Sequence, residues 1–515
     1  MAEPDTEWDV IVVGGALSGA STACLLRRRN PSLRVLILER TERFGRRVGE
    51  STVEIGSYFL RRVLGLNEHL LECHLPKQGI RFWAANDRCG SLGACSEIGP
   101  RYSVRLPGYQ VDRAVLDEHV LDRSRAEGAV VRRGIRVRRI ALRSGGRQTV
   151  VWEDAAGASG TCSARWVVDA SGVAALLARQ EGWLQPNREH PIAACWCRWT
   201  GVKSWDDRVL AEKYPQWACR CHTERTTATN HLTGYGWWAW WIPLKGGDVS
   251  VGVVFDRRIT ELPPGPSLAE RLRTMLLAHP AARELFADAR CREGDAHFRS
   301  DLAYSSEIYA VDGAVLVGDA AAFLDPFYSP GMDWIAFTAS AAASLVDGSL
   351  RGAAPALACH NRRFTLAYGR WFRALYRDKY RYLGDHELMR LAFRLDLGLY
   401  YLGSVLHVYR TGASALECPS FARPGAGLAA AFMGLYNRRF AAIAEARRRR
   451  GAWGRRNAGR YYAFTGFEFN RRLSLRVLGA VASWGGLELR EGWRTWFSRR
   501  GERSEPRPLT AIQPI

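Results

Sequence analysis

VIVVGGALSG, residues 10–19, is the stretch that decides the fold class of this 515-residue chain. Its β-branched start predicts a buried strand, its small residues a tight turn, and residues 20–28 a helix. A second strand is predicted over 35–38, with Glu39 at its end. Small residues let the backbone approach a pyrophosphate, the helix N-terminus faces its charge, and the acidic residue binds ribose hydroxyls. The stretch therefore predicts Rossmann-type dinucleotide binding, although Ala16 replaces the usual second glycine of the pattern.

Three later segments indicate that the dinucleotide is a flavin. The sequence Val-Asp-Arg at 111–113 precedes a predicted helix over 114–127, and residues 166–172 read as a strand followed by a tight turn. Residues 314–321 predict a strand that runs into the start of a helix and carries Asp319. In flavoproteins that resemble this chain, an aspartate in that place binds the ribityl chain. A simple helix N-cap is the alternative interpretation of Asp319.

The rest of the chain predicts an antiparallel sheet and a helical region. Aromatic residues and alternating patterns over 186–285, as in 236–244 and 249–255, predict the sheet on the substrate side. From about Phe337 the pattern is helical and rich in arginine. The predicted class is α/β, a Rossmann-type FAD-binding domain with an antiparallel substrate-side sheet and a C-terminal helical region. The predicted parts are 1–185 with an inserted segment at about 73–107, 186–285, 286–345, 346–500 and a disordered tail at 501–515.

Charge limits the classes of partner. The net charge is +21, and arginine supplies most of it, as in the run at 447–450. Such patches can meet nucleic acid, an anionic membrane or an acidic protein. We find no zinc-finger or RNA-binding signature, so nucleic acid is not an expected partner. A non-catalytic protein that binds anionic lipid or a partner through its arginine-rich helices stays open as an alternative.

Targeting signals and cysteine usage indicate a reducing, cytoplasmic setting. Residues 1–5 are acidic and lack the layout of a signal peptide, and the longest apolar run, 397–409, is too short for a transmembrane segment. Twelve scattered cysteines indicate a reducing compartment rather than a disulfide framework. A cluster of four cysteines and one histidine offers potential zinc ligands. Its Cys-x-Cys spacing departs from the usual zinc pattern, so no metal is expected; the cluster comprises Cys195, Cys197, Cys219, Cys221 and His222.

Lys77 is one of only five lysines, against 68 arginines. A primary amine differs from a guanidinium because it can lose its proton and act as a nucleophile or a tunable hydrogen-bond donor. Lys77 precedes a strand predicted from the sequence Ile-Arg-Phe-Trp at 80–83. Taken alone, it would be a solvated lysine at a strand edge.

Four motifs together resemble the flavin-dependent halogenases, a family within the aromatic-hydroxylase-like FAD flavoproteins. The first is the glycine turn, and the second is GEST at 49–52, which resembles the segment that begins the helix beside the flavin. WAWWIP at 238–243 matches the family signature W-x-W-x-I-P in full. FLDPFYSPG at 323–331 matches F-x-x-P-x-x-S-x-G. Lys77 falls where the family keeps its active-site lysine.

The resemblance implies an FAD-dependent halogenase of secondary metabolism, such as antibiotic biosynthesis. Reduced flavin from a separate flavin reductase, oxygen and chloride or bromide would yield a hypohalous acid. Lys77 would hydrogen-bond this acid or form a haloamine, and would present electrophilic halogen to a phenol-, pyrrole- or indole-like ring, free or tethered to a carrier protein. Burial should lower the pKa of this lysine.

The implied site residues fall into three groups. Lys77 and Ser329 are the expected catalytic residues. Trp238, Trp240 and Tyr328 are expected to form the wall between flavin and substrate. The expected cofactor contacts are Gly14, Gly15, Ala16, Ser18, Gly19, Glu39, Arg47, Glu50, Arg113, Asp319, Pro326, Gly331 and Met332.

Two departures from the family pattern affect the expected chemistry. Tyr328 stands where halogenases that act on tryptophan have a glutamate, which favours phenol- or pyrrole-like rings. Pro330 removes a backbone N–H from the turn expected to hold halide, so Gly331 and Met332 would have to donate. A halogenase-like monooxygenase or dehydrogenase that does not halogenate is therefore the main alternative. The sequence leaves the oligomeric state open.

Overall fold

The glycine-turn segment forms the strand–helix–strand unit that its sequence predicts. The computed structural model describes residues 7–106, 108–464 and 472–496, so the predicted tail at 501–515 lies outside the described residues. Strand β1 (Trp8–Val13) leads into helix α1 (Leu17–Arg29) and then into β2 (Val35–Leu38). The two strands are parallel. They lie centrally in a sheet of order β19-β20-β10-β1-β2-β7, and this order confirms the predicted Rossmann-type class. The other strands in this order are β19 (Ala310–Val311), β20 (Ala314–Leu316), β10 (Ser159–Asp169) and β7 (Val130–Arg132).

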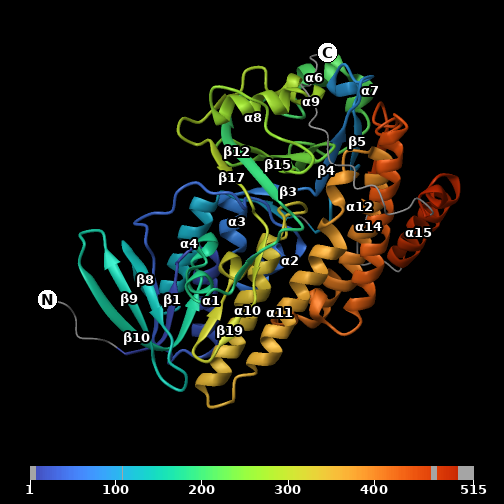
Figure 1. Cartoon of the computed structure of the whole chain (residues 1–515). Helices are drawn as coiled ribbons and strands as arrows, with labels where there is room; N and C mark the ends of the chain where they lie inside the picture. Colours follow the sequence, from blue (N-terminus) through green and yellow to red (C-terminus); the bar gives the residue numbers. More distant parts are fainter. Residues whose placement is uncertain (1–6, 107, 465–471, 497–515) are drawn as a thin grey trace.

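The central strands of this sheet are almost entirely buried, as is typical of parallel strands that are covered on both faces. Strand β10 (Ser159–Asp169) pairs with β1 on one side and with β20 (Ala314–Leu316) on the other, in both cases in parallel. Helix α1 packs against α4 (Arg113–Ala126) and α10 (Gly331–Leu350). The outer part of β10 continues into an antiparallel ribbon with β9 (Gln148–Asp154) and β8 (Ile135–Ala141), which lies at the left of Figure 1.

The second sheet is mostly antiparallel and lies above the first in Figure 1. Its strands are β12 (Ile192–Thr200), β13 (Thr229–Gly234), β14 (Trp237–Pro243) and β15 (Val249–Asp256), extended by β4 (Ile80–Ala84), β5 (Ser96–Pro100), β22 (Tyr461–Phe464), β16 (Arg290–Cys291) and β17 (His297–Arg299). Both faces are buried. Trp238 and Trp240 belong to the main core, whereas Trp241 belongs to a separate core cluster on the other face. This alternation follows from the period of two along a strand.

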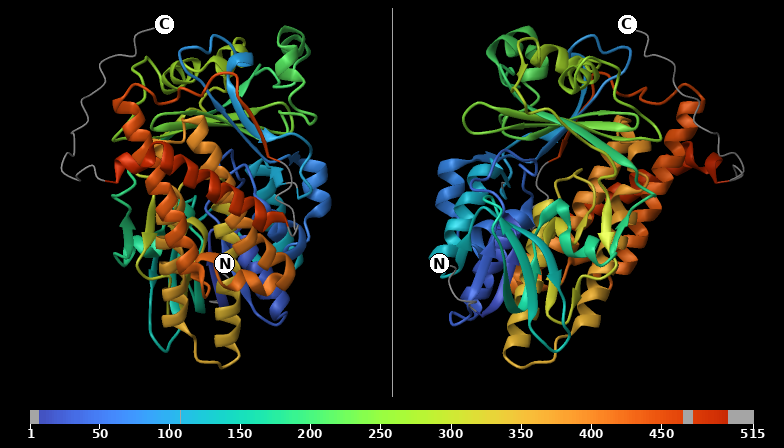
Figure 2. Two further views of the ribbon diagram at one scale, coloured as in Figure 1. Left: turned by 90° about the vertical axis from the view of Figure 1, so that its right-hand side faces the viewer. Right: turned by 60° about the vertical axis from the view of Figure 1, so that its left-hand side comes forward.

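Helices of the last third flank both sheets (Figure 2). They are α11 (Leu357–Trp371), α12 (His386–Tyr400), α14 (Ala426–Arg449) and α15 (Arg472–Arg490). Their arginines include a buried ion-pair centre, because Arg447 contacts Asp385 at 2.9 Å and Glu387 at 2.6 Å. None of the helices in the described ranges combines the length and the apolarity needed to cross a membrane.

The chain around Asp319 differs from the prediction of a strand that runs directly into a helix. Asp319 lies in a short 3-10 turn (Gly318–Ala320), followed by β21 (Ala322–Phe323), and the α-helix begins only at Gly331. Pro326 and Pro330 explain the delay, since a proline is tolerated at a helix start but interrupts a helix interior. The placement of the predicted domain boundaries stays a prediction.

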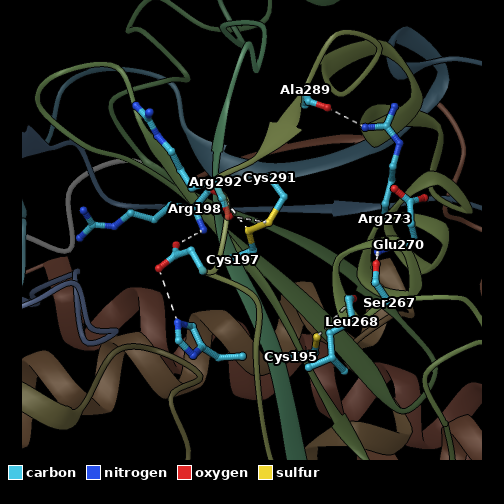
Figure 3. Close-up of a disulfide and its surroundings, with 12 residues drawn as sticks. Cys195, Cys197, Arg198, Ser267, Leu268, Glu270, Arg273, Ala289, Cys291 and Arg292 are labelled. Carbon is cyan, nitrogen blue, oxygen red and sulfur yellow. Dashed lines mark hydrogen bonds and ion pairs between the residues drawn. A yellow bond between two sulfur atoms is a disulfide. The ribbon is translucent and has the colours of Figure 1, made fainter.

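The structure also contains a disulfide that the cysteine pattern did not predict. Cys197 of β12 is bonded to Cys291 of β16, 94 residues later, where the two strands pair (Figure 3). This pair could not be predicted from the cysteine spacing, because Cys291 has no cysteine close to it in the chain. The sulfur of Cys197 is consumed in the bond, so it cannot join Cys219 and Cys221 in the zinc site considered above.

Removal of this disulfide should destabilise the fold. Because a cross-link restricts the unfolded chain, Cys291→Ser should lower the free energy of unfolding by about 2–4 kcal/mol and lower the melting temperature. Calorimetry without reductant measures the effect, and Cys359→Ser, at an exposed free cysteine, is the matched control. Equal melting temperatures, or twelve titratable thiols in the denatured protein, would contradict the bond.

Candidate active site

The larger of two adjoining cavities, of about 850 Å³, opens at the C-terminal ends of β1 and β2. Gly14, Ala16 and Ser18 line it. Gly14 has a φ of +100°, and a Cβ there would lie 2.5 Å from the carbonyl oxygen of Ala170. A Cβ at Gly19 would lie 1.9 Å from the carbonyl oxygen of Gly14, so Gly19 permits the turn to pack rather than lining the cavity. Both glycines thus let the turn pack against neighbouring backbone at the edge of the cavity, and the approach of a phosphate to this turn stays a prediction.

The predicted acidic and basic contacts surround the same cavity. Glu39 lines it and also braces the turn, because its carboxylate accepts a hydrogen bond from the backbone N–H of Gly15 at 2.8 Å. Arg113 and Arg47 both line the cavity and both face Asp117, at 3.0 Å and 3.5 Å. One end of the cavity is therefore charged, and the ion pairs with Asp117 hold the two arginines in place there.

Glu50 has a partner that the sequence did not reveal. Arg198 contacts Glu50 at 2.7 Å and Asp112 at 2.7 Å, and so ties the GEST segment to β12. Burial raises the pKa of Glu50 to about 7, while Arg198 opposes that rise. One arginine among 68 carries no distinguishing signal in the sequence, which is why Arg198 was missed.

The F-x-x-P-x-x-S-x-G segment forms a strained turn at the start of α10. Tyr328 and Ser329 both have positive φ, +71° and +56°, which is uncommon for residues with a side chain. Pro330 then precedes the helix, whose first residues are Gly331 and Met332. The first amides of a helix have no acceptor within it. Tyr328 lines the smaller of the two cavities. The rest of the turn lines the larger cavity, through Pro326, Ser329, Pro330, Gly331 and Met332.

A series of buried hydrogen bonds connects the W-x-W-x-I-P segment to the F-x-x-P-x-x-S-x-G segment. Trp238 donates its indole N–H to the hydroxyl of Tyr380 at 2.9 Å, and Tyr380 donates to Asp325 at 3.0 Å. His190 lies 2.6 Å from the same carboxylate oxygen. Neither His190 nor Tyr380 belongs to a recognised motif, so the sequence could not indicate that they position both signatures.

The smaller cavity, of about 350 Å³, contains Lys77. The side chain is only 2% exposed, and its Nζ donates to the hydroxyl of Ser51 at 2.8 Å and to the carbonyl oxygen of Thr52 at 2.9 Å. Burial lowers the pKa of Lys77 to about 8, although the carboxyl groups of Glu54 and Asp333 oppose the shift. Ser51 lines the larger cavity and Thr52 the smaller one, so the amine lies at their boundary.

Aromatic rings separate the two cavities. Trp238 and Trp240 line the larger cavity and Tyr328 the smaller one. Buried Phe327 lies between them, with ring centres 5.2 Å from Trp238 and 4.3 Å from Tyr328. The tryptophans therefore face the dinucleotide side of the partition, and Tyr328 faces the other side.

Tyr328 is anchored by the C-terminal helices. Its hydroxyl donates to Asp396 at 2.9 Å, and the same carboxylate contacts Lys379 at 2.5 Å and accepts from Tyr436 at 2.6 Å. Lys379 is fully buried, and burial lowers its pKa against the effect of Asp396. The strained turn thus depends on residues far later in the chain.

The lowered proton affinity of Lys77 can be measured directly because the chain has so few lysines. Carbon-13 labelling of lysine should give five side-chain signals, and the signal absent from Lys77→Arg should titrate with a midpoint near pH 8, below the ordinary lysine value of 10.5. Nuclear magnetic resonance across pH 6–11 measures it. A midpoint near 10.5 for that signal would contradict the buried environment described here.

Comparisons with known proteins agree with this arrangement. The protein-family model described as tryptophan halogenase matches residues 9–93 and 100–380. Flavin-dependent halogenase chlA of Dictyostelium discoideum is 27% identical over 67% of this chain and 61% of its own length. Sulochrin halogenase gedL of Aspergillus terreus is 25% identical over 70% of this chain and 67% of its own.

Solved structures share the fold. The crystal structure of halogenase PltM superposes with a TM-score of 0.73 over 93% of this chain and 97% of PltM, at 19% identity. The myxobacterial chondrochloren halogenase CndH gives 0.59 over 72% of this chain and 82% of CndH, at 24% identity. The family match covers every signature described above and the lining of the larger cavity, whereas part of the lining of the smaller cavity lies beyond residue 380. The chain therefore belongs to the tryptophan halogenase family of flavin-dependent halogenases.

Proposed function

We propose that the protein is an FAD-dependent aryl halogenase that takes reduced flavin from a separate reductase, together with oxygen and chloride or bromide. The observation that carries the proposal is the buried amine of Lys77 at the boundary of two cavities. One cavity has the backbone turn, acidic strand end and arginines that a flavin dinucleotide requires. The other is lined mainly by apolar and aromatic side chains, as an aromatic substrate requires.

The residues around the larger cavity fit FAD. Gly14 lines the cavity without a side chain, which suits the pyrophosphate. The Glu39 carboxylate accepts one hydrogen bond from Gly15 and two from Thr41, which leaves one lone pair on Oε2 for a ribose hydroxyl. Asp319 lines the cavity close to the start of α10, where it suits the ribityl chain. When bound and reduced, FAD supplies with oxygen the oxidising power that converts halide to hypohalous acid.

Within this function, Lys77 guides the oxidised halogen and α10 holds the halide. Two protons of the Lys77 ammonium group are used by Ser51 and Thr52, which leaves the third to bind the hypohalous acid. With a pKa of about 8, the amine is also partly neutral near physiological pH, as a haloamine route requires. Pro330 offers no N–H, so the amides of Gly331 and Met332 take the halide at the positive end of the helix.

The substrate is proposed to be an electron-rich arene. Tyr328 replaces the glutamate of tryptophan-type halogenases, and its hydroxyl is already committed to Asp396. A ring that supplies its own activation, such as a phenol or pyrrole, suits such a site. PltM is described in complex with phloroglucinol and FAD, and gedL as a sulochrin halogenase.

Loss of the amine should separate halogenation from flavin chemistry. Lys77→Ala should retain flavin and consume oxygen, yet lose halogenated product at least 100-fold, since the group that delivers the halogen is gone. The assay is mass spectrometry for halogen isotope patterns over a panel of phenols, pyrroles and indoles. Lys203→Ala removes a partly exposed surface lysine and is the control. Equal loss of product and oxygen consumption would assign Lys77 a structural role.

Asp319 should govern retention of the cofactor instead. Asp319→Ala removes an acceptor from the dinucleotide cavity and should lower affinity for FAD about tenfold. Flavin absorbance per protein after gel filtration measures this, with Asp288→Ala at the exposed surface as control. Unchanged flavin content would contradict the placement of the cofactor.

A further inference from the structure

Two carboxyl groups share the smaller cavity with Lys77, and the halogen-delivery steps described above do not use them. Glu54 begins α2 (Glu54–Tyr58), and Asp333 lies in the first turn of α10. The two helices approach closely at Gly56, where a Cβ would lie 2.9 Å from Cβ of Met332 and 3.3 Å from Oδ1 of Asp333. The fold thus places both acids beside the amine.

Tyrosines from one helix end orient both acids. Tyr400 donates to Oδ2 of Asp333 at 3.0 Å, and the backbone N–H of Gly56 donates to Oδ1 at 2.7 Å. Tyr401 donates to Oε1 of Glu54 at 2.6 Å. These consecutive tyrosines both reach the cavity where α12 changes into a π-helical turn, a feature frequent at functional sites. These hydrogen bonds therefore hold both carboxyl groups in fixed orientations at the cavity.

Their environment favours proton exchange with a weak acid. Burial raises the pKa of Asp333 to about 8 and also raises that of Glu54, and the neighbouring charge of Lys77 only partly offsets the effect on Asp333. Burial holds the pKa of Tyr400 well above 10, so Tyr400 remains a donor. The titratable groups that face the two acids are Lys77, Tyr376, Tyr400, Tyr401 and Tyr409.

We propose that Glu54 and Asp333 form an acid pair that binds a hydroxyl group on the aromatic substrate and removes its proton. This inference rests on the proposed function and narrows its substrate class to hydroxyarenes. Glu54 accepts the proton, since it is partly open to the cavity while Asp333 is 1% exposed with both oxygens engaged. Asp333 positions Glu54, because it accepts a hydrogen bond from the backbone N–H of Gly56 on the same helix as Glu54.

The proposed step balances as follows. The O–H bond of the substrate breaks, its proton passes to the Glu54 carboxylate, and the electron pair stays on oxygen as a phenolate. The ring carbon attacks the halogen of the hypohalous acid, so a carbon–halogen bond forms and the halogen–oxygen bond breaks. The departing hydroxide takes the proton from that ring carbon and becomes water. Glu54 returns its proton to the product; the ring is oxidised and the halogen reduced.

Binding of a nitrile-labelled phenol to the FAD-loaded protein tests the acid pair without halide, oxygen or reductase. The probe is para-cyanophenol, whose nitrile infrared stretch distinguishes phenol from phenolate, and its methyl ether is the comparison ligand. The wild type should bind the ionised probe below the pKa of the free phenol and should bind the ether roughly 10- to 100-fold more weakly. Glu54→Gln should bind the probe in its neutral form, and its affinity for the probe should fall roughly 10- to 100-fold. Asp333→Asn should lose less affinity for the probe than Glu54→Gln.

Glu68→Gln, the same change at an exposed position of α3 (Asn67–Cys73), should match the wild type. If the wild type binds the probe in its neutral form, or binds phenol and ether with equal affinity, the acid pair is overturned. If Asp333→Asn loses more affinity for the probe than Glu54→Gln does, Glu54 is not the proton acceptor. Halogenation that depends on Lys77 would then still support the proposed function. Conversely, ionised binding without halogenated product from any phenol would support the acid pair while the proposed function fails.

Discussion

The hydrogen bonds from Lys77 to Ser51 and Thr52 are the contacts on which the site depends. They fix a buried amine at the boundary between a dinucleotide cavity and an aromatic one, and the surrounding chain is shaped to allow it. Gly108, on the strand paired with Lys77, shows this most clearly: a Cβ there would lie 2.8 Å from the same Thr52 carbonyl oxygen. Because burying a charged amine is costly, its lowered pKa follows directly from this placement.

The last third of the chain completes the site rather than adding a separate module. Strand β22 pairs with β5 in the second sheet, and Asp396 anchors the strained Tyr328. Tyr400 and Tyr401 orient the two acids beside Lys77. No motif marks these residues in the sequence, yet Asp396, Tyr400 and Tyr401 form part of the wall of the smaller cavity.

The sequence could predict features that depend on local chemistry. The glycine turn and Glu39 require particular residue types at fixed spacing, so the Rossmann-type class followed from them. The burial of Lys77 followed only from the resemblance to the halogenases, since the lysine alone predicts a solvated strand edge. Contacts between distant segments could not be predicted, because one arginine, tyrosine or cysteine resembles another until the chain is folded. Arg198, Tyr380 and the bond from Cys197 to Cys291 belong to this group. The prediction of a helix start at Asp319 was wrong for a local reason, because Pro326 and Pro330 delay the start of the helix to Gly331.

The ring of Phe327 between Trp238 and Tyr328 has an evolutionary consequence. Because the proposed flavin cavity and the proposed substrate cavity have largely separate walls, substitutions in the second can alter the accepted molecule while the first stays intact. Diversification of such a protein can therefore proceed through residues such as Leu397 and Phe393 without loss of its redox machinery.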